Sequence, residues 1–401
     1  MTLRGFVARR VATCDPERGT LEDAAVVLDG PRVVYVGPRA GAPPGAALVD
    51  VGDRVVTPGL VDAHTHACWV GSRHGEYTVR MAGGDYGDIA KAGGGILSSH
   101  RAVAAATEDA LVEALVRRLR RMATLGVTTV EVKSGYGLEP EHELKQLAAI
   151  ARASASPGVP AVVPTFLALH ALPPSADRVA YVAHVARELV PQVAREHLAL
   201  FVDAYVDANA FTVAEARAVG EAARTNGLGV RLHVGQFADI GGADLAAELG
   251  AASVDHVEHI SPAGIQAVAR AGVAAVLLPV ASFTLAQPPP PVRALREAGV
   301  SLVVASDANP GTAPTESLPL ALALAVRLYG MTPDEALVAA TRHAAASLGF
   351  RDRGVLREGA RADLVVWDLP HEHALVQPWG VTKTWTVLVE GKEVSEARDE
   401  Q

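Results

Sequence analysis

Two histidines stand two residues apart in "DAHTH", at His64 and His66, directly after an apolar run. In an extended strand such side chains point to the same face, so the two imidazoles can chelate one metal ion. The H-x-H pattern alone is more often that of surface or buried structural histidines. Its position at the C-terminal end of a predicted strand, after "TPG", favours the metal site.

Three later apolar runs each end on a single polar residue, namely His233, His256 and Asp307. Unrelated buried polar residues would each need a hydrogen-bond partner, whereas imidazoles and a carboxylate that converge on one point match a divalent cation with an open position for water. We therefore predict His64, His66, His233 and Asp307 as metal ligands. His256 and Asp307 are the predicted catalytic groups.

The elements that would position these residues alternate between apolar runs of strand length and helical patterns. Such alternation is typical of a parallel sheet, and eight runs predict an α/β fold of the (β/α)8 TIM-like barrel type. The eight runs are "RVVTPGLVDAHTH", "VTTVEVKSG", "PAVVPTFLALH", "ALFVDAYVD", "VRLHVGQF", "SVDHVEHI", "VAAVLLP" and "VSLVVASDAN". Helix starts are predicted at Thr107, Thr212 and Thr332, the last two with capping boxes or Pro at the first position.

Short alternating runs at both ends of the chain predict a small β-sandwich domain built from the two termini. We expect residues 1–56 and 356–401 to form this domain and residues 57–355 to form the barrel. The long, glycine-rich connection from Met81 to Ser99 suggests a mobile flap over the site.

The composition limits the classes of partner. The chain has 401 residues, 49% apolar residues, 4% aromatic residues and a formal net charge of −9. Scattered basic residues on an acidic chain disfavour nucleic acid and anionic membranes, so we expect a small-molecule substrate. Two cysteines, Cys14 and Cys68, fit a reducing cytoplasm, and no export or membrane-spanning signal is present in this sequence.

The order of the predicted ligands, with flanking β strands from both termini, resembles the amidohydrolase superfamily. Many members of that superfamily bridge two metals with a carboxylated lysine on the fourth strand. Here the fourth run has no lysine, and Lys133 lies on the second, so we expect a single metal ion and a structural or supporting role for Lys133. Zinc and iron both suit the ligands.

Longer segments are similar to the imidazolonepropionase family of histidine degradation, and together they cover nearly the whole chain. They are "GSRHGEY", "GGGILSSHRAVAAAT", "TTVEVKSGYGLEPEHELK", "TFLALHALP", "GGADLAAELGAASVDHVEHIS" and "SDANPGTAPTESLPLALALA". The resemblance implies hydrolysis of 4-imidazolone-5-propanoate to N-formimidoyl-L-glutamate, and a homodimer. Its expected substrate-binding residues are Arg73, Tyr136, His170, Gln236, Asn309, Gly311 and Thr312.

By this resemblance, metal-activated hydroxide would attack the ring carbonyl. Asp307 would carry the water proton to the departing nitrogen, while His256 would stabilise the oxyanion. The chain departs from the family at Gly235, where an acidic residue is usual. Gln236 cannot act as a base, but its amide can match the N–H and C=O edge of the ring.

Several alternatives stay open. The alternative to substrate binding for Arg73 is a surface ion pair. For Tyr136 and His170 the alternative is a structural role, and for Pro310 and Gly311 it is only to shape a turn. His259 lies on the opposite strand face from His256 and is expected to be structural. Rival functions are a nucleobase deaminase with the same metal set and a noncatalytic barrel scaffold.

Overall fold

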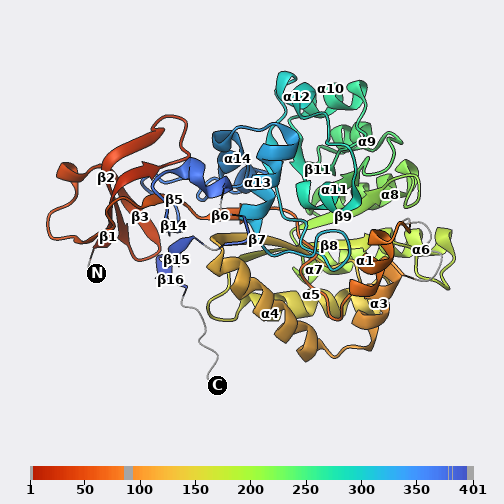
Figure 1. The fold of residues 1–401 in the computed structure, drawn as a ribbon. Helices are drawn as coiled ribbons and strands as arrows, with labels where there is room; N and C mark the ends of the chain where they lie inside the picture. Colours follow the sequence, from red (N-terminus) through yellow and green to blue (C-terminus); the bar gives the residue numbers. More distant parts are fainter. Residues whose placement is uncertain (1–2, 85–93, 378, 382, 395–401) are drawn as a thin grey trace.

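The computed structural model describes residues 3–84, 94–377, 379–381 and 383–394, and these residues form a barrel and a smaller β domain (Figure 1). Among them, eight parallel strands form one sheet in which each strand pairs with the next along the chain. The strands are β6 (Leu60–Asp62), β7 (Val127–Lys133), β8 (Ala161–Leu169), β9 (Phe201–Val206), β10 (Gly229–Val234), β11 (Ser253–His256), β12 (Ala274–Leu277) and β13 (Leu302–Val304).

The ends of this sheet meet beyond β6 and β13. A parallel bridge joins Thr65 to Ala308, and the amide of Asp307 donates to the carbonyl oxygen of His64 over 3.1 Å. The predicted (β/α)8 barrel is therefore confirmed. Ring closure takes place at the segments that carry the predicted metal ligands.

Helices cover the outside of the barrel (Figure 1). Between β6 and β7 lie α1 (His74–Met81), α3 (Ile96–Ala105) and α4 (Glu108–Thr124); the later ones are α5 (Pro140–Ser154), α6 (Arg178–His184), α7 (Val190–Arg195), α8 (Val213–Thr225), α9 (Gly242–Leu249), α10 (Pro262–Ala271), α11 (Pro279–Leu285), α12 (Val292–Glu297), α13 (Leu318–Tyr329), α14 (Pro333–Ala339) and α15 (Arg342–Ser347). A π-helical turn, Val185–Leu189, joins α6 to α7. None of the described helices is long and apolar enough to cross a membrane.

The predicted helix starts are confirmed. Thr107 accepts a hydrogen bond from the third amide of α4, and Thr212 and Thr332 each form a complete capping box. These caps satisfy amides that the first helical turn leaves without partners.

The small β domain contains strands from both ends of the chain, which lie side by side in Figure 1. Its mixed sheet runs β16-β15-β14-β5-β1-β2-β3, and β4 pairs with β1. The strands are β1 (Arg4–Ala12), β2 (Thr20–Asp29), β3 (Arg32–Pro38), β4 (Ala47–Asp50), β5 (Val55–Pro58), β14 (Leu364–Trp367), β15 (Thr384–Val389) and β16 (Lys392–Glu393), with 3-10 turns at Arg39–Gly41 and Glu372–Val376. The predicted domain of both termini is confirmed.

The first predicted run, "RVVTPGLVDAHTH", is not one strand. It divides at Gly59 into β5 of the small sheet and β6 of the barrel. A Cβ atom on Gly59 would lie 2.1 Å from Oγ1 of Thr128, so the chain passes between the sheets only without a side chain. The proposed domain boundary at residue 56 falls inside β5.

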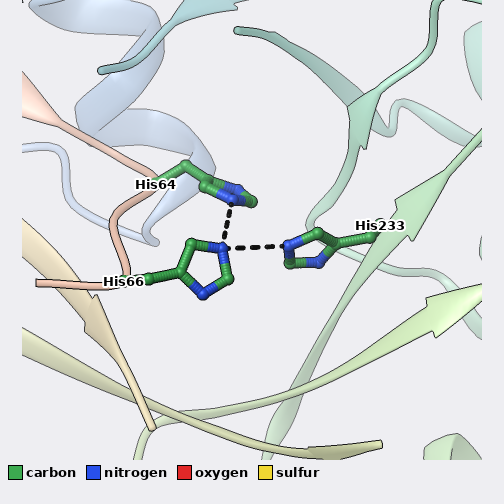
Figure 2. Close-up of side chains that lie close together, drawn as sticks. All are labelled: His64, His66 and His233. Atoms are coloured by element: carbon green, nitrogen blue, oxygen red, sulfur yellow. Dashed lines mark hydrogen bonds between the residues drawn. The ribbon is translucent and has the colours of Figure 1, made fainter. Parts of the chain in front are cut away.

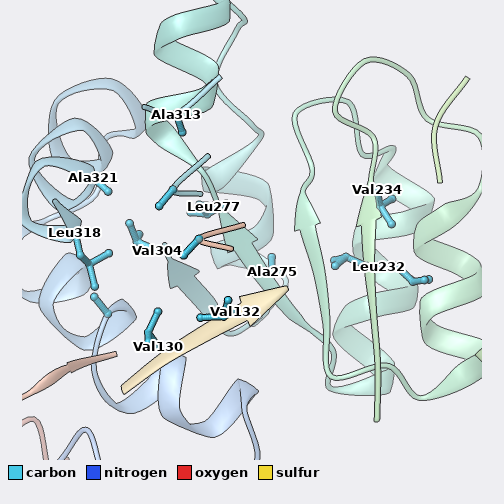
Figure 3. Close-up of a cluster of buried hydrophobic side chains, with 14 of the residues drawn as sticks. Val130, Val132, Leu232, Val234, Ala275, Leu277, Val304, Ala313, Leu318 and Ala321 are labelled. Carbon is cyan, nitrogen blue, oxygen red and sulfur yellow. The ribbon is translucent and has the colours of Figure 1, made fainter. Parts of the chain in front are cut away.

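The barrel strands bury apolar side chains against the surrounding helices. Val130 and Val132 of β7 belong to the same buried cluster as Leu318 and Ala321 of α13 (Figure 3). Because successive side chains of a strand point to opposite faces, the residues between these valines face the barrel interior. Charged side chains occupy that interior, as described below.

Candidate metal centre and active site

Three imidazoles meet at the barrel mouth (Figure 2). Nε2 of His66 lies 3.3 Å from Nε2 of His64 and 3.3 Å from Nε2 of His233. All three side chains are buried. The two rings converge as predicted, although His64 and His66 lie just beyond β6 rather than on it.

Two carboxylates fix the tautomers of the His64 and His233 rings. Nδ1 of His64 lies 2.6 Å from Oδ2 of Asp255, and Nδ1 of His233 lies 3.1 Å from Oδ1 of Asp203. A carboxylate offers only lone pairs, so each Nδ1 donates and each Nε2 presents its own lone pair. Two lone pairs then face Nε2 of His66, which has at most one proton, and a shared cation resolves this conflict.

Asp307 completes the donor set. Its Oδ1 lies 3.6 Å from Nε2 of His64 and 3.5 Å from Nε2 of His66, and among the described residues it accepts no hydrogen bond. Burial raises the pKa of Asp307 well above its ordinary value. An unpaired buried carboxylate oxygen is costly, and a metal ion would supply its partner. Three imidazoles and one carboxylate suit zinc or iron.

A buried charge network lies beneath the imidazoles. Nζ of Lys133 lies 2.8 Å from Oε1 of Glu131 and 2.8 Å from Oδ2 of Asp203. Burial opposes the ammonium charge, but the attraction of Asp203 and Glu131 outweighs it and raises the pKa of Lys133. Arg231 lies 3.5 Å from Asp255 in the same network. The supporting role expected for Lys133 is compatible with these contacts.

His256 lies beside the metal ligands, and its ring centre is 5.4 Å from that of His233. Burial lowers the pKa of His256 well below its ordinary value, so the ring is neutral. Its φ of 81° and the φ of 54° at Asp307 lie in the left-handed region, where a non-glycine residue costs about 1–3 kcal/mol. Such backbone strain is typical of residues that a fold aims into a site.

A pocket of about 450 Å³ opens over this cluster. Most of the predicted site residues line it together with Ile96, Tyr205 and Phe237; the predicted ones are His66, Arg73, Tyr136, His170, His233, Gln236, His256, Asp307, Asn309 and Thr312. His64 lies behind the pocket surface and has no exposed area. Gly311 is not part of the lining, but it contacts Arg73.

Arg73 is buried and lies on the pocket wall. Glu76 holds one edge of its guanidinium, with distances of 2.9 Å to Nε and 2.7 Å to Nη2. The other edge lies against Gly311, where an added Cβ atom would be 2.3 Å from Nη1. Arg73 is thus a positioned cation inside the pocket rather than a surface ion pair.

Gln236 has its side chain oriented by Tyr205, whose hydroxyl donates to Oε1 over 2.6 Å. Gln287 donates to the carbonyl oxygen of Gln236. The preceding Gly235 has a φ of 63°, and a Cβ atom there would meet no atom closer than 3.5 Å. An acidic residue would therefore fit the space, but it would adopt a strained left-handed backbone conformation.

Tyr136 lies in a loop whose backbone amides donate hydrogen bonds to two buried side chains of α5. Glu143 accepts hydrogen bonds from the amides of Gly135 and Leu138, and Gln146 accepts one from Tyr136 over 3.0 Å. Gln146 also donates to the carbonyl oxygen of Cys68, close to the metal segment. This cradle places the Tyr136 ring in the pocket.

His170 donates from Nδ1 to the carbonyl oxygen of Gly135 over 2.7 Å. Burial lowers the pKa of His170 to about 3, so the ring is neutral and its Nε2 is an acceptor. The Asn309 amide is used within its own loop, where Oδ1 accepts from the amides of Gly311 and Thr312. The half-buried Thr312 hydroxyl is held in the same loop, because it accepts from Nδ2 of Asn309 over 3.0 Å and donates to its Oδ1 over 3.2 Å.

The remaining predictions have mixed outcomes. His259 is exposed and lies outside the pocket. The central part of the predicted flap, residues 85–93, lies outside the described residues. A second group of close metal-binding side chains, His371 to His373, contains Glu372, which already pairs with Arg10 over 2.8 Å.

Comparison with known proteins decides the family. The amidohydrolase family model matches residues 55–395. The chain belongs to the amidohydrolase family. The chain is 45% identical over 94% of its length to the imidazolonepropionase of Caulobacter vibrioides, of which it covers 96%. It is 42% identical over 96% of its length to the imidazolonepropionase of Paracoccus denitrificans, covering 98% of that protein. Within the amidohydrolases, it therefore groups with the imidazolonepropionases.

Solved structures confirm the amidohydrolase fold. An adenosine deaminase from Xanthomonas campestris with bound zinc has a TM-score of 0.73 at 21% identity, covering 97% of this chain and 92% of the other. An atrazine chlorohydrolase from Arthrobacter aurescens complexed with zinc has a TM-score of 0.67 at 18% identity, covering 98% and 95%. These likenesses describe architecture and not substrate.

Sequence reasoning missed several functional residues of this amidohydrolase. Asp203, Asp255 and Glu131 support the imidazoles, and Tyr205 orients Gln236. Their signal was a charged or polar residue inside a strand otherwise buried on both faces, where such a residue needs a partner. The partners lie on other strands, so the pairing was not visible in the sequence.

Proposed function

We propose that this amidohydrolase is an imidazolonepropionase that hydrolyses 4-imidazolone-5-propanoate to N-formimidoyl-L-glutamate. The observation that carries the proposal is the position of Arg73 on the wall of the pocket above the three imidazoles. A substrate with a carboxylate on one side and a hydrolysable cyclic amide on the other fits this pairing. Near-full-length similarity to proteins of that name supports the same reading.

The proposed cofactor is one divalent metal ion, zinc or iron, held by His64, His66, His233 and Asp307. Such an ion lowers the pKa of water to roughly 7 and so supplies hydroxide at neutral pH. The convergent Nε2 lone pairs and the unpaired Oδ1 of Asp307 support this assignment.

Asp307 is the proposed proton carrier. Its carboxylate takes a proton from the attacking water and returns it to the ring nitrogen as the bond between that nitrogen and the carbonyl carbon breaks. The new bond is between the water oxygen and the same carbon, so one water is consumed and a carboxylate forms. Neutral His256 donates a hydrogen bond to the carbonyl oxygen as negative charge develops there.

Substrate recognition uses the rest of the pocket. Arg73 binds the propionate carboxylate, for which a guanidinium has matching geometry. Gln236, oriented by Tyr205, pairs with the N–H and C=O edge of the ring. Tyr136, His170 and Thr312 complete the contacts, and Asn309 and Gly311 shape the wall.

We also propose that the protein is a homodimer and that it acts in the cytoplasm. Light scattering tests the homodimer.

The nearest alternative is a nucleobase deaminase, because an adenosine deaminase shares the fold. The position of Arg73 argues against a deaminase, since a neutral nucleobase has no carboxylate for the guanidinium to bind. The test incubates zinc-loaded protein with imidazolone propanoate, adenosine and cytosine in parallel and identifies products by mass spectrometry. Turnover of the imidazolone alone supports the proposal; release of ammonia from a base, or no turnover of any substrate, overturns it.

A further inference from the structure

We propose that Lys133 is a positioning residue that ties together the supports of all three histidine ligands and thereby sets the affinity of the metal site. The proposal rests on the metal site proposed above. It concerns an ammonium group that contacts none of the ligands directly.

Three carboxylates surround the ammonium. Nζ lies 2.8 Å from Oε1 of Glu131, 2.8 Å from Oδ2 of Asp203 and 3.8 Å from Oδ2 of Asp255. The side chains of all four residues have 0% exposure. Bulk solvent does not reach these contacts, so they are not screened as surface ion pairs are.

Two of the carboxylates act on a ligand directly. Asp203 holds Nδ1 of His233 and Asp255 holds Nδ1 of His64. Each carboxylate thus joins an imidazole to the ammonium, and rotation of either aspartate would turn a ligand. Second contacts of this kind fix the ring orientation and the tautomer of a metal-binding histidine.

Glu131 acts on the third ligand through the backbone. Its Oε2 accepts from the amide of Thr65 over 3.1 Å, and Thr65 lies between His64 and His66. The Lys133 amide also donates to the Thr65 carbonyl oxygen over 3.0 Å. The segment that carries both histidines is therefore held by the Lys133 strand.

Charge alone and positioning predict opposite results. Arg231, 3.5 Å from Asp255, is the other cation described in this network, so two cations face three carboxylates. Removal of the ammonium makes the buried region more negative, and a purely coulombic effect would tighten cation binding. Loss of positioning would weaken it, because the carboxylates would repel one another and release the imidazoles.

The experiment measures the zinc dissociation constant of metal-stripped protein by competition with a chromophoric chelator. Lys133→Met is compared with Lys145→Met, which removes three hydrogen bonds to carbonyl oxygens at the end of α3 but lies outside the network. We expect Lys133→Met to raise the constant about 10- to 100-fold, the usual effect of losing such a support. The zinc dissociation constant of Lys145→Met should stay within about twofold of that of the parent, even where the lost hydrogen bonds lower its melting temperature.

Unchanged or tighter zinc binding by folded Lys133→Met overturns the proposal. If Lys133→Met does not fold, the double variant Lys133→Met with Glu131→Gln restores the charge balance, and it should bind zinc more weakly than Glu131→Gln alone. Equal binding by those two variants likewise overturns the proposal. A parent that binds no zinc would instead refute the metal site itself.

Discussion

Gly311 lies against the guanidinium of Arg73, so closely that a Cβ atom on the glycine would be 2.3 Å from Nη1. The two residues come from loops after the first and the last barrel strands. The absence of a side chain at position 311 therefore fixes where a cation can lie in the pocket.

Gly311→Ala should displace the guanidinium and raise KM about tenfold, which is about 1.4 kcal/mol and close to the lower end of the range for a hydrogen bond to a charged group. The kcat should change less, since the metal ligands are untouched. Gly75→Ala is the matched control, because a Cβ atom there meets nothing within 4 Å. A KM for Gly311→Ala equal to that of the control would contradict the role of Arg73.

Gln236→Glu replaces a neutral amide that Tyr205 orients with an anion. The carbonyl oxygen of the substrate ring then loses the N–H donor of the Gln236 amide and meets a negative charge. We therefore expect kcat/KM to fall by about 100-fold. Tyr205→Phe, which removes only the orienting hydroxyl, should cause a smaller loss. Steady-state kinetics of the two variants check this, and unchanged parameters for Gln236→Glu would exclude substrate contact.

Asp62 gives a pH prediction for the metal-free protein. Burial raises its pKa from 3.8 to about 7, although Ser306 donates to both oxygens. Between about pH 4 and pH 7 the unfolded chain loses this proton and the folded chain keeps it, so the parent loses stability as the pH rises. Asp62→Asn has no such titrating group. As the pH rises through that window, its free energy of unfolding should increase relative to that of the parent by up to about 1.4 kcal/mol per pH unit. Denaturant unfolding across the range tests it; a constant difference would contradict it.

Gln146→Leu should destabilise the loop of Tyr136. Three buried backbone groups, the amides of Tyr136 and Gly137 and the carbonyl oxygen of Cys68, would lose their partner. We expect a loss of about 3 kcal/mol in the free energy of unfolding and a raised KM. Gln192→Leu, at an exposed contact with Glu196, should cost less than about 0.5 kcal/mol. Similar losses in both variants would contradict the cradle.

Much of this architecture was readable from the sequence because barrel strands and helix caps are local patterns. Thr212 and Thr332 begin helices as predicted, and the eight runs each contain a barrel strand. The first run was misread because "RVVTPGLVD" keeps its apolar pattern while the chain changes sheets at Gly59. The reason, the approach of Thr128, involves a residue far along the chain.

The candidate site divides in the same way. His64 and His66 are predictable because their spacing is local in the sequence. The contacts of Lys133 with Asp203 and Asp255 join three strands, and no local pattern indicates which buried charges meet. The in-loop bonding of Asn309 was likewise hidden, since the same sequence fits a substrate contact or a turn.

The imidazoles at the barrel mouth are proposed to hold the metal that supports hydrolysis of imidazolone propanoate. The most direct measurement follows the loss of ring absorbance of freshly prepared 4-imidazolone-5-propanoate with zinc-loaded parent and with His233→Ala. We expect rapid loss with the parent and a rate at least about 1000-fold lower with the variant, because one of the proposed ligands is gone. No turnover by the parent would contradict the assigned reaction, and equal turnover by His233→Ala would contradict the metal mechanism.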